Sequence, residues 1–307
     1  MKSEWAAAEK SIANDYLNFC KMASEDISLF NNFRSHNDYG VILEGGEKRI
    51  GLGALKYLKR LGGYNWFKNN FSEIIKNDLY GNPILHSFNK SINCSSSTLQ
   101  YSHDLYNCIL LLNKNTKIPL TIVEVGGGFG GFARLVLSLL NVEKYYLIDQ
   151  KEPLALAKKY LENFPRISKK VIYIEANEIF RIYSTINDID LFVASASIAE
   201  LDFNTQKFYF KNFIQRSLFS YLIYNSVHLV GVKDFLNSSL TKLNKNNFDI
   251  KIHNPWFRIL YIYISHKKIN VQIFGKENQK FWNYFKGINC FLLRGLRSVR
   301  YKIFGIY

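Results

Sequence analysis

The strongest constraint on the fold is an alternation of apolar runs and helical segments in the second half of the chain. After residue 120, short runs rich in β-branched and aromatic residues are separated by segments with helical periodicity of roughly 10 to 15 residues. Strands that alternate with helices in this way are typical of a parallel, doubly wound sheet, the Rossmann-like α/β class. The predicted strands read LTIVEV, YYLID, VIYIEA, DLFVA and SYLIY, and the helices between them cover about 129–140, 153–163 and 204–216.

The segments on either side of this alternation have different patterns. Residues 1–115 carry mainly helical periodicity, interrupted by turn sequences such as GGYN and GNP, and predict a helical N-terminal extension that contributes to the acceptor site. After residue 248 the runs IKIH, ILYIYIS and INVQIFG have no strong helices between them. We expect these runs to close the sheet with antiparallel strands, so that the sheet domain spans 116–280.

The C-terminal segment 281–307 is basic. Its sequence KGINCFLLRGLRSVRYKIFGIY contains lysines and arginines at helical spacing beside Leu and Phe, and no acidic residue. We favour a packed helix with a solvated basic face. The alternative is a peripheral contact with an anionic membrane or with a partner.

Composition limits the classes of function. The formal net charge of the 307 residues is +15, which favours an anionic partner. The four cysteines, Cys20, Cys94, Cys108 and Cys290, form no CxxC pair, so neither a zinc site nor a disulfide framework is indicated. The N-terminus lacks a signal-peptide core and no uncharged apolar run approaches about 18 residues, so we expect a cytoplasmic protein, with the inner membrane surface as the alternative.

The most informative motif is VEVGGGFGGFARL at residues 123–135. Five glycines follow a predicted strand and precede a predicted helix, so bare backbone N–H groups and the positive end of a helix face the carboxyl edge of the sheet. This arrangement predicts a polar or anionic ligand that approaches the backbone closely. A tight turn without a ligand is the less favoured interpretation, because so many glycines weaken a fold without an evident packing gain.

Two carboxylates accompany the glycines. Asp149 ends the next predicted strand, about 20 residues after the glycines, where an acid accepts hydrogen bonds from the hydroxyls of a ribose. It could instead cap the helix that begins near Pro153. Glu124 decides between two glycine spacings, because GxGxxG suits a dinucleotide whereas acid-x-G-x-G-x-G suits a ligand without phosphate. A buried carboxylate repels a pyrophosphate and favours an ammonium group, a description that fits S-adenosylmethionine.

With its glycine motif, the blocks KYYLIDQKEPLALAKKYL and DLFVASASIAELD and, more weakly, GNP at 81–83, the chain resembles class I S-adenosylmethionine-dependent methyltransferases. Within that class it is most similar to the bacterial sugar O-methyltransferases, over roughly residues 95–224. The resemblance implies a methionine site at the glycines, an ammonium contact at Glu124, a ribose contact at Asp149 and an adenine contact after the third strand. Asn177 could equally cap the next helix. The implied cofactor-binding set is Glu124, Gly126, Gly128, Gly130, Asp149, Gln150, Ala176, Asn177 and Ser195.

Methyl transfer to an alcohol needs a base that removes the proton of the acceptor. Glu200 lies in the block after the fourth strand, near the expected methyl donor, beside Ser195, Ser197 and Asp202, and it is our first candidate. His103 and His253 follow as alternative bases, ahead of His228, which comes after the fifth predicted strand. No cluster has convincing metal-ligand spacing.

The sequence therefore predicts an S-adenosylmethionine-dependent O-methyltransferase that acts on the hydroxyl of a sugar, in a nucleotide-linked sugar or a surface-polysaccharide precursor. Nucleic acid is not an expected partner, because the Asn-Pro-Trp at 254–256 lies in the wrong place for a base-methylating loop. An NAD(P)-dependent oxidoreductase and a non-catalytic membrane- or nucleic-acid-binding protein of the same fold stay open. So does the oligomeric state.

Overall fold

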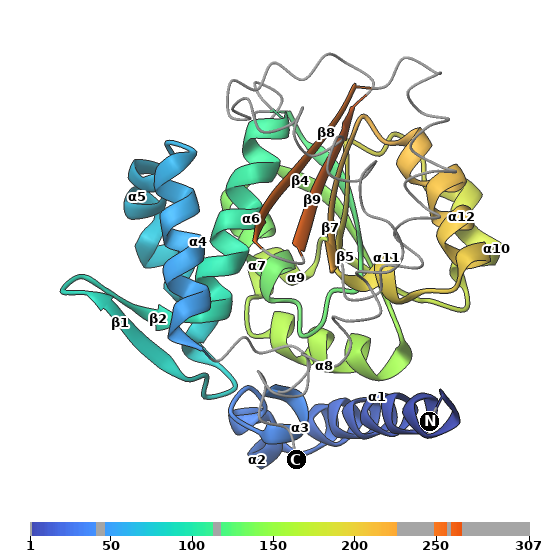
Figure 1. Ribbon diagram of the computed structural model, residues 1–307, viewed down its shortest axis with the longest axis horizontal. Helices are drawn as coiled ribbons and strands as arrows, with labels where there is room; N and C mark the ends of the chain where they lie inside the picture. Colours follow the sequence, from blue (N-terminus) through green and yellow to red (C-terminus); the bar gives the residue numbers. More distant parts are fainter. Residues whose placement is uncertain (1, 41–46, 113–117, 226–248, 257–258, 266–307) are drawn as a thin grey trace.

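The computed structural model describes residues 2–40, 47–112, 118–225, 249–256 and 259–265. Its centre is a seven-stranded sheet with helices on both faces (Figure 1). The strand order is β5-β4-β3-β6-β7-β9-β8. The strands are β3 (Leu120–Val125), β4 (Val142–Asp149), β5 (Val171–Glu175), β6 (Leu191–Ser195), β7 (Phe219–Asn225), β8 (Asp249–Trp256) and β9 (Ile259–Ser265).

The prediction of a mostly parallel, doubly wound sheet is confirmed. Strands β3 to β7 pair in parallel, whereas β9 pairs antiparallel with β7 and β8 antiparallel with β9. The two antiparallel strands close the sheet as expected from IKIH and ILYIYIS. The run INVQIFG lies outside the described residues.

The two faces of the sheet form separate apolar cores. Because side chains alternate along a strand, Ile122 of β3 belongs to the core on one face and the neighbouring Val123 to the core on the other. The first face is covered by α6 (Ser96–Leu112), α7 (Gly131–Leu139) and α8 (Lys151–Glu162). The second is covered by α10 (Ile179–Ile182), α11 (Ser197–Glu200) and α12 (Phe203–Asn212). Short segments complete the layers: α9 (Pro165–Ser168), η3 (Tyr183–Thr185) and η4 (Ile214–Arg216).

The strand order reverses at β3. From β3 the chain moves to β4 and β5 on one side, whereas β6 and β7 lie on the other side. The segments that leave the carboxyl ends of β3 and β6 therefore turn to opposite faces, to α7 and to α11. A crevice at such a reversal is the usual ligand site of an open α/β sheet. The glycine motif and the 195–200 segment flank this point.

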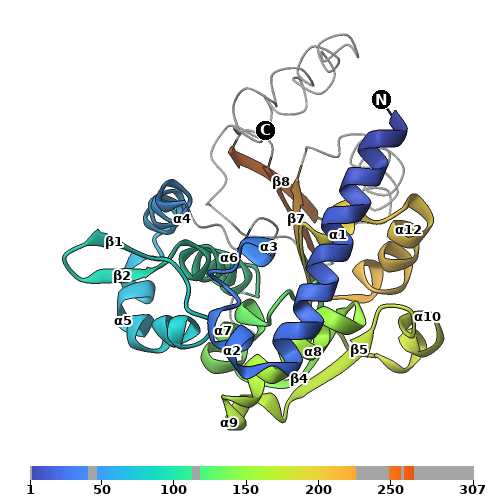
Figure 2. The ribbon, with the colours of Figure 1, turned by 90° about the horizontal axis from the view of Figure 1, so that it is seen from below.

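The N-terminal region is helical, as predicted, and also holds a β-hairpin that the sequence patterns missed. Its elements are α1 (Lys2–Glu25), α2 (Ile27–Asn32), α3 (Asn37–Gly40), α4 (Lys48–Arg60), α5 (Tyr64–Ile74), η1 (Ile75–Leu79), β1 (Leu85–Asn89) and β2 (Ile92–Ser95). The helix α1 packs against α8. It lies below α8 in Figure 1 and in front of it in Figure 2, which is the view from below. Buried residues of this region share one apolar core with the sheet.

Two buried arginines hold the N-terminal region in place: Arg34 binds its parts to one another, and Arg134 binds it to the helix α7 on the sheet. Arg34, with 1% of its surface exposed, donates to the backbone oxygen of Asn77 at 2.8 Å, to Asp78 at 3.0 Å and to the hydroxyls of Ser95 and Ser97 at 2.9 Å. Arg134 of α7 is fully buried and donates to Asn77 and to Glu73. A buried cation is stable only with such partners, so these contacts fix the position of the 73–97 segment against α7.

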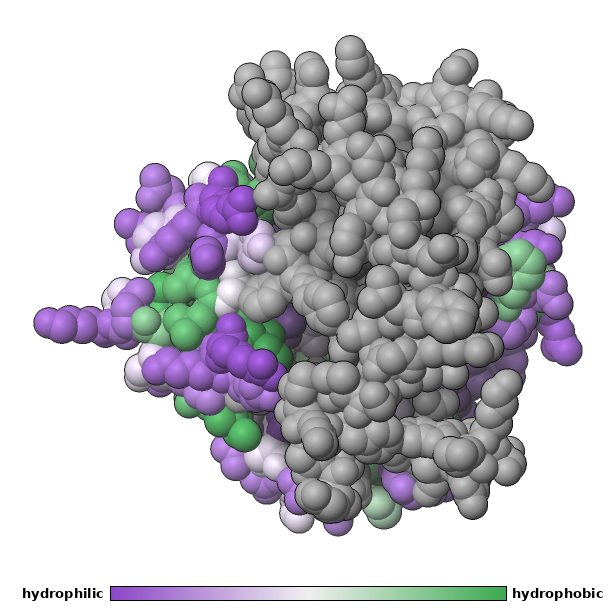
Figure 3. Space-filling view, in the orientation of Figure 1, coloured by the Kyte–Doolittle hydropathy of each residue, from purple (hydrophilic) through white to green (hydrophobic). Residues whose placement is uncertain are grey.

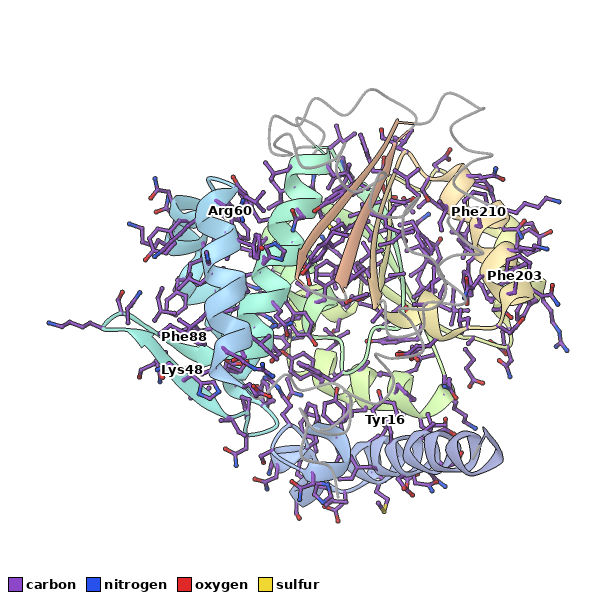
Figure 4. The ribbon with its side chains drawn as sticks, in the orientation of Figure 1. Tyr16, Lys48, Arg60, Phe88, Phe203 and Phe210 are labelled. Carbon is purple, nitrogen blue, oxygen red and sulfur yellow. The ribbon has the colours of Figure 1, made fainter. Side chains whose placement is uncertain are left out.

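The exposed face of α4 is strongly basic. The helix has five basic residues and no acidic one, and Lys48 and Arg60 mark its two ends (Figure 4). A space-filling view shows an apolar area among hydrophilic residues on the side of the molecule where α4 and the hairpin lie (Figure 3). Leu52 of α4 and Leu85 of β1 are 46% and 49% exposed. Part of the +15 net charge is therefore concentrated beside the hairpin. The predicted basic segment 281–307 lies outside the described residues.

None of the helices that the structure describes combines the length and the apolar character that a membrane span requires.

Candidate functional site

The loops that follow β3 and β6 touch each other at the reversal point. Ser197 donates its hydroxyl to the backbone oxygen of Val125. A Cβ atom on Gly126 would lie 2.2 Å from the Cβ of Ser197, and Gly126 has a φ of +78°. Gly126 is therefore required both by its left-handed backbone and by the approach of the second loop.

The other glycines of the motif are required for two different reasons, close packing at some positions and a left-handed backbone at others. A Cβ on Gly127 would lie 2.2 Å from a Leu147 methyl carbon, and one on Gly131 would lie 2.4 Å from the Phe129 ring. Gly128 and Gly130 have φ values of +55° and +84°. The expectation that the glycines lack a packing gain is thus wrong for Gly126, Gly127 and Gly131. The motif is tightly packed on the sheet side, whatever ligand it holds.

Glu124 is buried directly beneath the glycine loop. Only 2% of its surface is exposed, and its Oε2 accepts a hydrogen bond from the Tyr145 hydroxyl at 2.7 Å. The pKa of the Glu124 carboxyl is raised to about 7, chiefly by burial. The Tyr145 hydrogen bond opposes this rise, and the charge of Asp149 contributes to it. Without a cation nearby, this carboxyl is only partly ionised at neutral pH.

Asp149 ends β4 beside the same loop. Its Oδ2 accepts a hydrogen bond from the Gly128 backbone N–H at 3.2 Å, and its Oδ1 accepts one from the Gln150 N–H at 2.8 Å. The helix α8 begins at Lys151 with Gln150 as its N-cap and no side-chain cap bond. Asp149 is therefore not the cap of this helix, and the alternative interpretation is wrong.

Three carboxylates share this edge of the sheet. The pKa of Asp149 is raised to about 6, chiefly by burial. Its backbone hydrogen bonds oppose this rise, and the charge of Glu200 contributes to it. Asp149 in turn raises the pKa of Glu124. This edge of the sheet therefore has a negative potential that favours a cationic ligand.

The other predicted cofactor residues surround this cluster. Ala176 follows β5, and its backbone N–H donates to the Asp149 backbone oxygen at 2.8 Å. Asn177 is exposed, and the N-cap of α10 is Glu178, so Asn177 is not a cap. Gln150 and Ser195 are exposed at the ends of β4 and β6. The structure thus brings the nine residues of the predicted cofactor-binding set to one edge of the sheet.

Of the candidate bases, Glu200 lies closest to this edge in the fold. It is exposed at the end of the short helix α11, which is held in place by Ser197. Asp202 has a structural role instead, because its side chain caps α12 by accepting from the N–H groups of Asn204 and Thr205. The hydrogen bonds of Thr205 and Asn204 hold the pKa of Asp202 below its ordinary value.

His103 belongs to a buried polar cluster between α6 and the strands β7 and β9. The side chain is 5% exposed, with Nδ1 at 3.1 Å from Asp104 Oδ1 and Nε2 at 3.1 Å from Asn107 Nδ2. Tyr221 donates its hydroxyl to Asp104 at 2.9 Å, and Tyr263 donates to Asn107 at 3.1 Å. These contacts account for a polar side chain in the core without a catalytic role.

Of the other two candidate histidines, the structure describes only the backbone of one. His253 lies on the edge strand β8, where its backbone pairs with Tyr261, and His228 lies outside the described residues. Within the described part of the chain, no group of three or more His, Cys, Asp or Glu side chains could hold a metal ion.

Sequence patterns missed the aromatic cluster around the glycine loop. The Phe129 ring contacts Phe33 and Tyr39 from the N-terminal region at centroid distances of 5.4 and 6.3 Å, and Tyr160 of α8 at 4.8 Å. The Arg34 guanidinium lies 4.8 Å from the same ring. The only hint in the sequence was a phenylalanine between glycines, where its large ring needs a partner from elsewhere in the chain.

No protein-family model matches the chain, and no curated protein matches it. Solved structures do match parts of it. TrmK from M. capricolum, in complex with S-adenosylhomocysteine, is 16% identical over 56% of this chain and 72% of that chain, with a TM-score of 0.37. An rRNA methylase from Streptococcus thermophilus is 12% identical over 52% of this chain and 93% of that chain, with a TM-score of 0.42. A ribosomal protein L11 methylase from Lactobacillus delbrueckii subsp. bulgaricus is 16% identical over 55% of this chain and 79% of that chain, with a TM-score of 0.39.

The exclusion of nucleic acid as a partner is contradicted by these comparisons. The matching structures include an rRNA methylase. The position of Asn254-Pro255-Trp256, on which the exclusion depended, concerns one type of loop and says nothing about other acceptors on RNA. We therefore withdraw the exclusion.

Proposed function

We propose that the protein is an S-adenosylmethionine-dependent methyltransferase whose cofactor lies in the crevice between the glycine motif and α11. The observation that carries this proposal is a chain of like charges beside the buried Glu124: Glu200 raises the pKa of Asp149, and Asp149 raises the pKa of Glu124. S-Adenosylmethionine brings a sulfonium and an ammonium group, whereas a nicotinamide dinucleotide brings a pyrophosphate. A crevice with three carboxylates stabilises the first ligand and repels the second.

The residues present fit this ligand. The left-handed backbone at Gly126, Gly128 and Gly130 exposes main-chain groups at the carboxyl edge. Asp149 accepts from the ribose hydroxyls, and Glu124 interacts with the ammonium group through the loop or a bridging water. Ala176 and Asn177 lie beside the adenine ring, and Gln150 and Ser195 complete the pocket.

The chemistry requires alignment and proton removal. When bound, the cofactor would supply an electrophilic methyl group to an acceptor oxygen that the site holds in line with it. Glu200 takes the proton of the acceptor hydroxyl as the new carbon–oxygen bond forms. Its exposed position after β6 gives it access to both the crevice and solvent.

For the acceptor, we propose the hydroxyl of a sugar, in a nucleotide-linked sugar or a polysaccharide precursor. The resemblance of residues 95–224 to bacterial sugar O-methyltransferases supports this choice, and the basic face of α4 suits a phosphate-bearing acceptor. A ribose hydroxyl of RNA has the same chemistry and is tested beside it.

Calorimetric titration of the full chain with S-adenosylhomocysteine tests the cofactor. We expect saturable binding with one site per chain and no binding of NADH under the same conditions. The reverse result would replace the methyltransferase by an oxidoreductase. A screen with methyl-labelled S-adenosylmethionine then compares nucleotide-sugars, oligosaccharides and RNA, and label in RNA alone would overturn the choice of a free sugar.

A further inference from the structure

The N-terminal helix α1 lies at the same edge of the sheet as the proposed cofactor crevice. It packs along α8, the helix that follows Asp149 (Figures 1 and 2). Its side chains Phe19, Cys20 and Ala23 are buried, and Lys159 of α8 donates to the Ala23 backbone oxygen at 3.2 Å. The C-terminal half of α1 is therefore docked on α8.

Tyr16 is the residue of α1 that reaches toward the carboxylates. It lies on the side of the helix that faces α8 (Figure 4). Desolvation raises the pKa of its phenol, and the neighbouring Tyr39, Cys20 and Asp149 raise it further. This hydroxyl stays protonated at neutral pH and shares a hydrogen bond with the Cys20 thiol, so a ligand held by Asp149 would compete with Cys20 for it.

A second contact connects Tyr16 to the glycine loop. The ring of Tyr16 lies 5.9 Å from that of Tyr39, and Tyr39 lies 6.3 Å from Phe129, edge to face. Phe129 stands between Gly128 and Gly130. The position of α1 is thus coupled through packed rings to the backbone that holds the proposed ligand.

Two further observations place Tyr16 near the ribose and not near the methyl group. Burial raises the pKa of Cys20, one turn along α1 from Tyr16, to about 12, and the charges of Asp149 and Glu152 contribute to the rise. These two acids stand at the end of β4 and the start of α8. Glu200, the proposed base, instead leaves from β6 on the opposite side of the reversal point. The wall that α1 forms therefore covers the nucleoside half of the crevice.

We infer that α1 is a wall of the cofactor pocket and that Tyr16 is a cofactor-binding residue, whose hydroxyl contacts the ribose held by Asp149. This inference rests on the proposed function. Since α1 is anchored to α8 and to the glycine loop by separate contacts, ligand binding and helix docking stabilise each other.

The test compares Tyr16→Phe, which keeps the ring and removes the hydroxyl, with Tyr64→Phe on α5 as a matched control. Two probes are titrated: S-adenosylhomocysteine and 5′-methylthioadenosine, which has the nucleoside but no amino-acid part. We expect Tyr16→Phe to weaken both probes by the same factor, about 5- to 10-fold, as for the loss of one hydrogen bond. Tyr64→Phe should leave both affinities unchanged. The melting temperature without ligand should not move in either variant.

Hydrogen exchange gives an independent measurement on the unaltered protein. Saturation with S-adenosylhomocysteine should slow exchange in the C-terminal half of α1 as well as in the glycine loop. Normal affinity of the Tyr16→Phe variant for both probes, together with unchanged exchange in α1, would overturn the inference while leaving the cofactor site intact. Failure of the unaltered protein to bind either probe would overturn the proposed function itself.

Discussion

Tyr145 donates its phenolic hydroxyl to Glu124 at 2.7 Å, from the strand next to the one that carries Glu124. Both side chains are buried on the same face of the sheet, beneath the glycine loop. The hydrogen bond fixes the carboxyl in place but leaves its charge uncompensated, because a phenol is a neutral donor. The negative charge that a cationic ligand would neutralise is therefore built into the fold before the ligand arrives.

This burial makes the stability of the free protein depend on pH through Glu124. The pKa of the carboxyl is about 7 in the folded chain and about 4.3 in an unfolded one. A group whose pKa is raised on folding contributes stability below its unfolded pKa, and the contribution is lost as pH rises through its folded pKa. Glu124→Gln removes this loss. We expect its unfolding free energy, relative to the unaltered protein, to be higher at pH 8 than at pH 4.3 by about 3 kcal/mol.

Urea unfolding at a series of pH values measures this difference. Tyr145→Phe is the useful comparison, because it removes the hydrogen bond that lowers the Glu124 pKa and should move the pH-dependent region upward. The same pH profile for Glu124→Gln and the unaltered protein would mean that Glu124 is not the group that titrates.

The second prediction separates Glu124 from Asp149 by the part of the ligand that each one holds. Glu124→Gln should weaken S-adenosylhomocysteine by about 10-fold or more, because the variant loses the ionised partner of the ammonium group. It should not change the affinity for 5′-methylthioadenosine, which lacks that group. In the unaltered protein, binding of both compounds should weaken below pH about 6, the pKa of Asp149. Only S-adenosylhomocysteine should also weaken on acidification through pH 7.

Titration calorimetry at pH 5.5, 6.5 and 8 distinguishes these cases. Equal losses for the two compounds in Glu124→Gln would place the glutamate outside the methionine part of the pocket, contrary to our assignment.

The sheet, and the meeting of the proposed cofactor residues at one edge of it, were predictable because both depend on local signals. Apolar runs such as LTIVEV and the glycine motif are read from consecutive residues, and strand order then brings Asp149 and Ser195 to the same edge. The contacts of Arg34, Phe129 and Tyr16 were not predictable, since their partners lie far away in the sequence. The glycine spacing also predicts a ligand as the reason for Gly126 and Gly127. In the structure, packing against Ser197 and Leu147 already requires glycine at these two positions.

Gly126 gives a third prediction, on the contact between the two loops. Gly126→Ala places a methyl group 2.2 Å from the Ser197 Cβ at a residue with a φ of +78°. We expect a loss of about 2–4 kcal/mol of unfolding free energy, from overpacking and from backbone strain. Ser197→Gly in the same chain should recover the steric part but leave about 1 kcal/mol of strain. A double-mutant cycle measured by urea unfolding gives both numbers, and purely additive effects would show that the two loops do not touch in solution.

The buried cation Arg34 gives a fourth prediction. Arg34→Met keeps much of the side-chain volume but leaves the Asp78 carboxylate without its cation and removes the donor to the hydroxyls of Ser95 and Ser97. Removal of one partner from a buried ion pair costs about 3–5 kcal/mol. Arg49→Met is the matched control, because Arg49 is exposed and pairs with Glu47 on the surface; it should cost less than about 1 kcal/mol. Equal effects in chemical unfolding would mean that the Arg34 network does not stabilise the packing of the N-terminal region.

The last prediction concerns the proton of the acceptor, and it compares two acids that lie two residues apart. Glu200→Gln should leave the affinity for S-adenosylhomocysteine within about twofold and lower the rate of methyl transfer by about 10²-fold or more, the usual contribution of a general base. Asp202→Asn should leave both unchanged, because asparagine caps a helix as well as aspartate does and the role of Asp202 is to accept from Asn204 and Thr205. Rates measured with labelled cofactor on the acceptor found in the screen, from pH 6 to 9, give the comparison. A rate of Glu200→Gln equal to that of the unaltered protein would move the role of base to another residue. A slow Asp202→Asn would show instead that the position of α12 controls the rate.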